Sequence, residues 1–141
     1  IEAFRSLQAI WHFTSFTIGH SHATMYGFIT FIAWGGRYGL LPRATGKHPD
    51  RLLTGLHFWF ATIGVTAYVV VLSIAGTEQG LRWAGGDPFI ASVEAADPYW
   101  VARAVAGTMM FLAHLIFAYN VYCMTAAKPT IATRSPEEVA L

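Results

Sequence analysis

The stretch "LLTGLHFWFATIGVTAYVVVLSIA", residues 52–75, contains no charged side chain. At 1.5 Å per residue, a helix of this length crosses the roughly 30 Å hydrocarbon core of a bilayer. The whole chain has the same character, because 55% of its 141 residues are hydrophobic and 12% are charged. Soluble domains carry about 25% charged residues. The sequence therefore predicts a membrane protein.

Two further apolar stretches flank this segment. Residues 17–41 carry one charge, Arg37, close to their end before Pro42, and residues 100–126 are uncharged after Arg103. Each stretch is long enough to span a membrane. We predict an all-α membrane protein with three transmembrane helices, at about 17–41, 52–75 and 100–126. Residues 1–16 are expected to form an interfacial segment or the end of a preceding helix, and 127–141 a polar cytoplasmic tail.

The loops between the spans differ in charge and predict the orientation of the chain. The first loop region holds mostly basic side chains: Arg37, Arg43, Lys47 and Arg51 against Asp50. The second holds mostly acidic ones: Glu78, Asp87, Glu94 and Asp97 against Arg82. Basic loops favour the cytoplasm, so the N-terminus is expected outside and the C-terminus in the cytoplasm. The net charge of +1 indicates no nucleic-acid partner.

Several polar residues fall at or within the predicted spans. They are His20, His22, His57, His114 and Asn120. Polar side chains at membrane depth usually face protein or a cofactor rather than lipid. A bundle of three helices offers little cover for them, so we expect the chain to belong to a larger assembly. Cys123 is the single cysteine, which excludes an internal disulfide framework and a cysteine-rich metal site.

His20 and His22 stand two positions apart in "FTIGHSHATMYGF", residues 16–28. On an α-helix, such residues point about 200° apart, so they cannot hold one metal ion together but can hold two separate ones. Haem iron takes an axial nitrogen and offers an apolar ring for packing. Gly19 and Gly27 would let a macrocycle or a neighbouring helix approach closely. The alternative is two histidines that hydrogen-bond to neighbouring helices, and the residues alone leave both open.

The segment "GHSHATMYGF", residues 19–28, resembles the two-haem helix of the catalytic subunit of haem–copper oxidases, above all the cbb3-type cytochrome c oxidases. The next span, "LHFWFATIGVTAYVVVLSIAGTEQGLRW", resembles the H-F-W-x-A-x-I-G helix of that family and its Q-G-L-x-W exit. The segment "ASVEAADPYWVARAVAGTMMFLAHLIFAYNVY" resembles the last helix. The similarity covers about residues 11–126, with the three elements in order.

The resemblance implies a role for each histidine of the pair. His20 would be the proximal ligand of the high-spin haem, and His22 one axial ligand of the low-spin haem, both haems being b-type. The copper beside the high-spin haem would be held by residues outside this chain, on the remaining helices of the catalytic subunit, in the same or a separate polypeptide. Arg82 is expected near the haems, where it would either contact a haem propionate or anchor the helix at the interface.

The implied function is that of a terminal respiratory oxidase in the bacterial inner membrane. Electrons from cytochrome c would pass through the low-spin haem to the haem–copper centre, where oxygen is reduced to water and protons are pumped. Expected partners are cytochrome c-type subunits, the missing helices and membrane lipid. The alternatives are part of a nitric oxide reductase, which has a similar H-x-H-A-x-x-M-G helix, and a non-catalytic haem-binding subunit. His57 and His114 are interpreted as packed or hydrogen-bonded residues, with a quinone or proton-path role for His114 left open.

Overall fold

The computed structural model describes residues 3–126, and the regular elements in that range are all helical. In chain order they are α1 (Arg5–Trp11), α2 (Ser15–Thr24), the π-helical segment η1 (Met25–Thr30), α3 (Phe31–Thr45), α4 (Arg51–Ala84), α5 (Phe89–Glu94) and α6 (Asp97–Ala126). The predicted all-α fold is therefore confirmed. The polar tail predicted at 127–141 lies outside the described residues.

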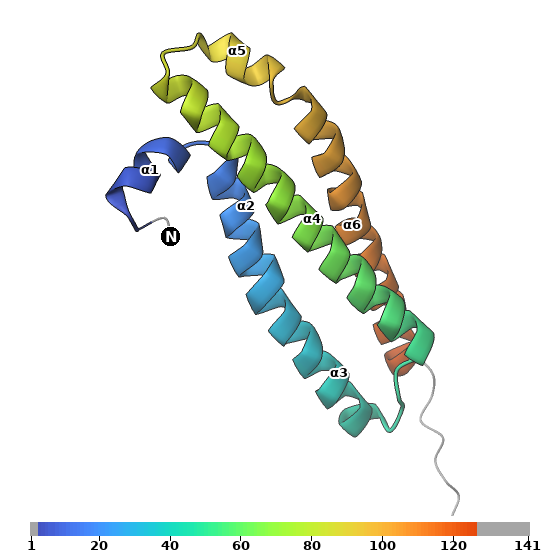
Figure 1. Cartoon of the computed structure of the whole chain (residues 1–141). Coiled ribbons are helices and arrows are strands. Elements are labelled where there is room, and N and C mark those ends of the chain that lie inside the picture. The colour runs from blue at the N-terminus through green and yellow to red at the C-terminus, as the bar shows by residue number, and fades with distance from the viewer. Residues whose placement is uncertain (1–2, 127–141) are drawn as a thin grey trace, which may run out of the picture.

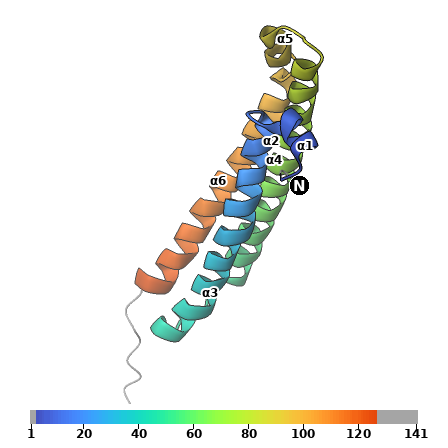
Figure 2. The same ribbon diagram turned by 90° about the vertical axis from the view of Figure 1, so that its left-hand side faces the viewer.

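Helix α4 is the central element of an elongated bundle (Figure 1). The continuous run α2–η1–α3 lies along one side of α4 and α6 along another, and both are antiparallel to it (Figures 1 and 2). Helix α1 lies at the end of the bundle where α4 finishes, and α5 spans the connection from α4 to α6 at that same end. The turn between α3 and α4 lies at the opposite end.

Within residues 3–126, two helices are long and apolar enough to cross a membrane, namely α4 and α6. The predicted first span is helical throughout but divided among α2, η1 and α3, which follow one another without a gap. This run continues past Pro42 to Thr45 and ends at Gly46, whose φ of 71° is in the left-handed region. The Gly46 N–H donates to the Pro42 carbonyl at 2.9 Å, which satisfies one carbonyl of the last turn.

Helix α4 begins at a hydrogen-bonded cap. The Asp50 carboxylate accepts a hydrogen bond from the Leu53 N–H at 2.8 Å, as expected for an N-cap residue. The Asp50 N–H in turn donates to the Asn120 side-chain oxygen of α6 at 3.1 Å. Asn120 is buried and also donates to the Thr54 hydroxyl at 3.1 Å. The start of α4 and the last turns of α6 are thus joined by side-chain hydrogen bonds.

Small residues bring the helices close together. Ala61 of α4 and Ala113 of α6 are completely buried beside Trp34. A methyl group placed on Gly64 would lie 3.1 Å from the Met110 backbone nitrogen, so α4 and α6 are in near-contact there. Close backbone approach through small residues is typical of helix packing in membranes, where lipid offers no hydrophobic driving force.

Large apolar side chains cover much of the outer surface of the bundle. Examples on the three long elements are Phe28, Ile32, Trp59, Val70, Phe111 and Leu115. Soluble monomers rarely expose extended apolar patches of this kind. The surface therefore suits contact with lipid or with further transmembrane helices, as the composition predicts for a membrane protein.

Candidate functional site

His20 and His22 lie in α2, shortly before the π-helical segment η1. Gly19 faces α4 and is buried, with a hypothetical Cβ only 3.1 Å from the Leu72 side chain. The His22 ring is half-buried and contacts the ring of Tyr68 on α4, with centroids 4.6 Å apart. His20 is exposed. Because the two residues differ by about 200° around the helix, His20 points away from the side that meets Tyr68.

One hydrogen bond defines the state of the His22 ring. Its Nδ1 lies 2.8 Å from the Ile18 carbonyl oxygen, one turn earlier in α2. A carbonyl can only accept, so Nδ1 carries the proton and donates it. The other ring nitrogen, Nε2, then holds a lone pair in the neutral imidazole. Metal-binding histidines commonly show this arrangement, with the non-ligating N–H donated to a backbone carbonyl.

Two hollows lie along α2 and η1, and His22 lines one of them. On the His22 side, a depression of about 280 Å³ is lined by Ser21, His22, Met25, Tyr26 and Thr30. On the His20 side of α2, Ala23 and Gly27 follow His20 by one and two turns. These two small residues line an apolar groove of about 370 Å³ against α4, with Val69 and Val70 on its other wall. Space is therefore present next to the His22 imidazole, and an apolar groove begins one turn beyond His20.

The π-helical segment η1 begins three residues after His22. Its wider turn is accompanied by a bond from the Thr30 hydroxyl to the Met25 carbonyl, five residues earlier, at 2.8 Å. Single π-helical turns occur often at functional sites because they change the phase of the residues that follow. Tyr26, within this segment, packs edge-on against Trp34 and His114 at centroid distances of 5.3 Å and 5.4 Å.

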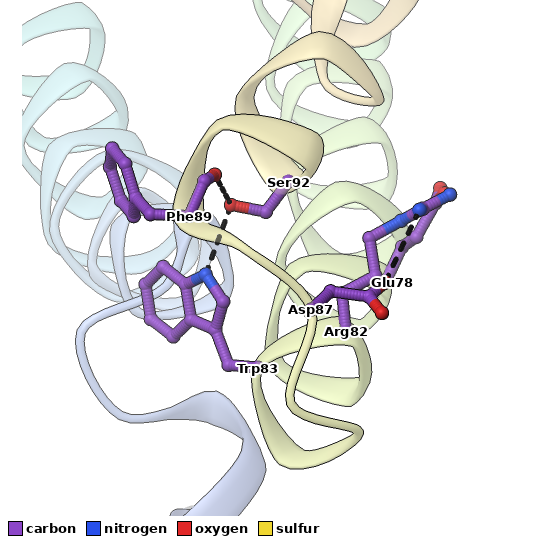
Figure 3. A network of polar contacts seen from close by, with 6 residues as sticks. All are labelled: Glu78, Arg82, Trp83, Asp87, Phe89 and Ser92. Atoms are coloured by element: carbon purple, nitrogen blue, oxygen red, sulfur yellow. Dashed lines mark hydrogen bonds and ion pairs between the residues drawn. The ribbon is translucent and has the colours of Figure 1, made fainter.

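Arg82 lies near the end of α4 and is paired with acidic residues of the chain itself (Figure 3). Its Nε and Nη2 donate to the same oxygen of Glu78 at 3.2 Å and 2.8 Å, and its Nη1 lies 3.7 Å from the Asp87 carboxylate. Tyr99 of α6 donates to the other Glu78 oxygen at 3.0 Å. The network joins the end of α4 to α6. A haem propionate would have to share the Arg82 guanidinium with these carboxylates, and such a contact remains a prediction.

Trp83 fixes α5 against the end of α4 (Figure 3). Its indole N–H donates to the Ser92 hydroxyl at 2.9 Å, and Ser92 donates to the Phe89 carbonyl at 2.7 Å. Ser92 is buried, and the Trp83 and Phe89 rings stack with centroids 6.1 Å apart. This arrangement gives Trp83 a structural role in closing that end of the bundle.

The other two histidines of the spans are packed among aromatic rings. His57 is buried, lies 4.4 Å from the Trp34 ring centroid and has its Nδ1 3.2 Å from the Tyr38 hydroxyl. Its Nε2 has no hydrogen-bond partner within residues 3–126. The His114 Nδ1–H donates to the Met110 carbonyl at 2.7 Å. Both arrangements agree with the interpretation of His57 and His114 as packed or hydrogen-bonded residues.

The family model described as "Cytochrome C and Quinol oxidase polypeptide I" matches residues 1–109. This chain belongs to that oxidase subunit I family. The resemblance found in the sequence is thereby confirmed.

Several subunit I proteins are similar to the chain over most of its length. The cbb3-type cytochrome c oxidase subunit CcoN1 of Stutzerimonas stutzeri is 34% identical over 90% of the chain and 29% of its own length. A cytochrome c oxidase subunit 1 homolog of Agrobacterium tumefaciens is 38% identical over 83% of the chain and 23% of its own length. Cytochrome c oxidase subunit 1 of Rhodobacter capsulatus is 34% identical over 91% of the chain and 26% of its own length. The chain thus spans about a quarter of the length of these relatives.

Sequence reasoning missed two features around the histidine pair of this subunit I chain. The first is Tyr68, because a ring contact between helices depends on how they are packed. The second is η1, since the sequence "MYGFIT" carries no compositional sign of a π-helical turn. Within residues 3–126, no group of three or more His, Cys, Asp or Glu side chains is placed to hold a metal ion. The assignment of His20 and His22 as ligands of separate haems stays a prediction.

Proposed function

We propose that this chain forms the haem-binding part of a terminal respiratory oxidase of the cbb3 type. The observation that carries the proposal is the placement of His20 and His22 on different flanks of α2, in a member of the oxidase subunit I family. His22 lines a hollow, and an apolar groove begins one turn beyond His20. The names of the similar proteins favour a cytochrome c oxidase over a nitric oxide reductase or an electron-carrying scaffold.

The residues present fit two haems, one on each side of α2. His22 would ligate the low-spin haem through Nε2, while its Nδ1–H is held by the Ile18 carbonyl at 2.8 Å. His20 would be the proximal ligand of the high-spin haem, and the small residues Ala23 and Gly27, one and two turns further along the helix, line an apolar groove. A haem needs one or two axial ligands from the protein and otherwise an apolar pocket, which both flanks offer.

When bound, the haems would supply the electron transfer from cytochrome c to a haem–copper centre that reduces oxygen to water and pumps protons. The chain's own part is to hold two ligands on one rigid helix, so that the distance between them is constant. Copper ligands are expected on helices outside this chain, and so is the second axial ligand of the low-spin haem. Cytochrome c-type subunits are the expected partners.

The proposed location is the bacterial inner membrane, with the basic α3–α4 turn in the cytoplasm and α5 outside. Arg82 would then lie at the external end of α4. Its pairing with Glu78 at 2.8 Å makes it available to a propionate only as a shared cation. We keep Arg82 as a proposed propionate contact on the strength of its planar, multidentate guanidinium.

The test is a reduced-minus-oxidised spectrum of the assembled, membrane-extracted protein. His22→Ala should remove the low-spin haem band and retain the high-spin signal, whereas His20→Ala should do the reverse. His48→Ala, in the turn between α3 and α4, is the matched control and should leave both signals unchanged. If both signals survive in the His20 and His22 variants, the proposed function is wrong.

A further inference from the structure

Tyr68 lies beneath the imidazole of His22. The two rings are 4.6 Å apart at their centroids and inclined by 41°. Tyr68 also approaches Gly107 of α6, where a hypothetical Cβ would lie 3.9 Å from the Tyr68 Cε2 atom. The tyrosine ring of α4 thus lies close both to the His22 ring on α2 and to α6.

The His22 ring is restrained from two directions. The bond from Nδ1 to the Ile18 carbonyl at 2.8 Å holds one edge of the ring to its own helix. The Tyr68 ring supports the imidazole from α4. A single hydrogen bond would still leave the ring free to tilt about that bond, and the second contact opposes this tilt.

We infer that Tyr68 is a positioning residue that sets the plane of the His22 imidazole for iron ligation. This inference rests on the proposed function, because it assumes that His22 ligates the low-spin haem. Partners beyond the ligand itself commonly orient metal-binding histidines, and they tune the metal through that orientation. The supporting contact is between the two rings, so the tyrosine hydroxyl group is not required for it.

The experiment compares Tyr68→Leu with Tyr68→Phe in the assembled, haem-loaded protein at equal haem content. The readouts are the low-spin ferric signal in electron paramagnetic resonance and the midpoint potential of that haem. Tyr68→Leu removes the ring and should shift and broaden the low-spin signal and change the potential. Tyr68→Phe keeps the ring and should reproduce the unsubstituted protein in both measurements.

Two results would overturn the inference. One is an unchanged signal and potential in Tyr68→Leu, and the other is an equal shift in Tyr68→Phe. If Tyr68→Leu does not assemble, Gly107→Val takes its place, because a branched side chain against Cε2 displaces the Tyr68 ring. The same shift is expected there, and an unchanged spectrum again contradicts the inference.

His22→Ala, measured alongside, separates this inference from the proposed function. If His22→Ala loses the low-spin signal while Tyr68→Leu keeps an unchanged signal and potential, only the positioning role is overturned. Retention of the low-spin signal in His22→Ala would overturn the proposed function, and the positioning role with it. If His22→Ala loses the low-spin signal and Tyr68→Leu shifts it, both the proposed function and the positioning role are supported.

Discussion

Asn120 of α6 is hydrogen-bonded to the backbone of Asp50, the residue that caps α4. The Asn120 side-chain oxygen accepts from the Asp50 N–H at 3.1 Å, and its amide group donates to the Thr54 hydroxyl at 3.1 Å. Asn120 is only 1% exposed. One buried amide therefore satisfies groups from the α3–α4 turn and from the first turn of α4.

We expect Asn120→Leu to destabilise this end of the bundle. The substitution removes the side-chain partner of the Asp50 N–H and of the Thr54 hydroxyl, and a typical hydrogen bond contributes about 0.5–1.5 kcal/mol. Thermal unfolding of the assembled protein in detergent measures the effect. Thr125→Ala is the matched control, because its hydroxyl bonds only to carbonyls of its own helix. Equal unfolding temperatures for Asn120→Leu and the unsubstituted protein would contradict the prediction that Asn120 stabilises this end of the bundle.

Gly76 on α4 permits the close approach of the start of α2. A methyl group at Gly76 would overlap the backbone of Phe16. Gly76→Ala should therefore push α2 away from α4, at a cost of about 1–3 kcal/mol as in other overpacked contacts. Thermal unfolding and haem content of the assembled protein are the measurements, since α2 carries both proposed ligands.

The control for this substitution is Gly55→Ala. A Cβ at Gly55 meets no atom of the described chain within 4 Å. Alanine is favoured over glycine in helices by about 1 kcal/mol, so Gly55→Ala should preserve or raise stability. A Gly76→Ala protein as stable and as haem-rich as Gly55→Ala would show that the α2–α4 contact can adapt.

The apolar stretches predicted the helices but not their ends. Helix α4 continues to Ala84, beyond the apolar residues 52–75. Its polar extension is held by contacts with the N-terminal part of the chain, where the Trp11 indole N–H donates to Thr77 at 3.1 Å and the Ser15 N–H to Gln79 at 3.1 Å. Hydropathy reports which residues suit lipid, whereas a helix ends where its backbone hydrogen bonds end.

The histidine spacing predicted two directions around α2, and helix geometry alone is sufficient for that. The support of His22 by Tyr68 could not be predicted, because it depends on the register between α2 and α4. The pairing of Arg82 with Glu78 was accessible from their spacing of four residues. The hydrogen bond from Tyr99 to Glu78 could not be predicted from spacing, since Tyr99 lies on a different helix.

Glu78→Gln should weaken the Glu78–Arg82 network at the end of α4 only slightly. Glu78 and Arg82 are about one-third exposed, and exposed ion pairs contribute little to stability because water and salt screen them. The decrease in unfolding temperature should therefore be small, and it should be smaller still at high salt. Glu94→Gln, an exposed acid in α5, is the control. A large decrease in unfolding temperature that added salt does not reduce would contradict the prediction that this network is exposed and screened.

The charge asymmetry of the loops predicts the orientation of the chain, and cysteine labelling tests it. In a Cys123→Ser background, His48→Cys places a single thiol in the α3–α4 turn, and Glu94→Cys places one at the end of α5. Both positions are exposed, so a thiol there is accessible to reagents. Because basic loops remain in the cytoplasm, a membrane-impermeant maleimide should label Glu94→Cys in spheroplasts and His48→Cys only in inverted vesicles. The reverse pattern would place the proposed haem ligands nearer the cytoplasmic side. If both variants were labelled from the same side, the prediction that α4 crosses the membrane between these two positions would be wrong.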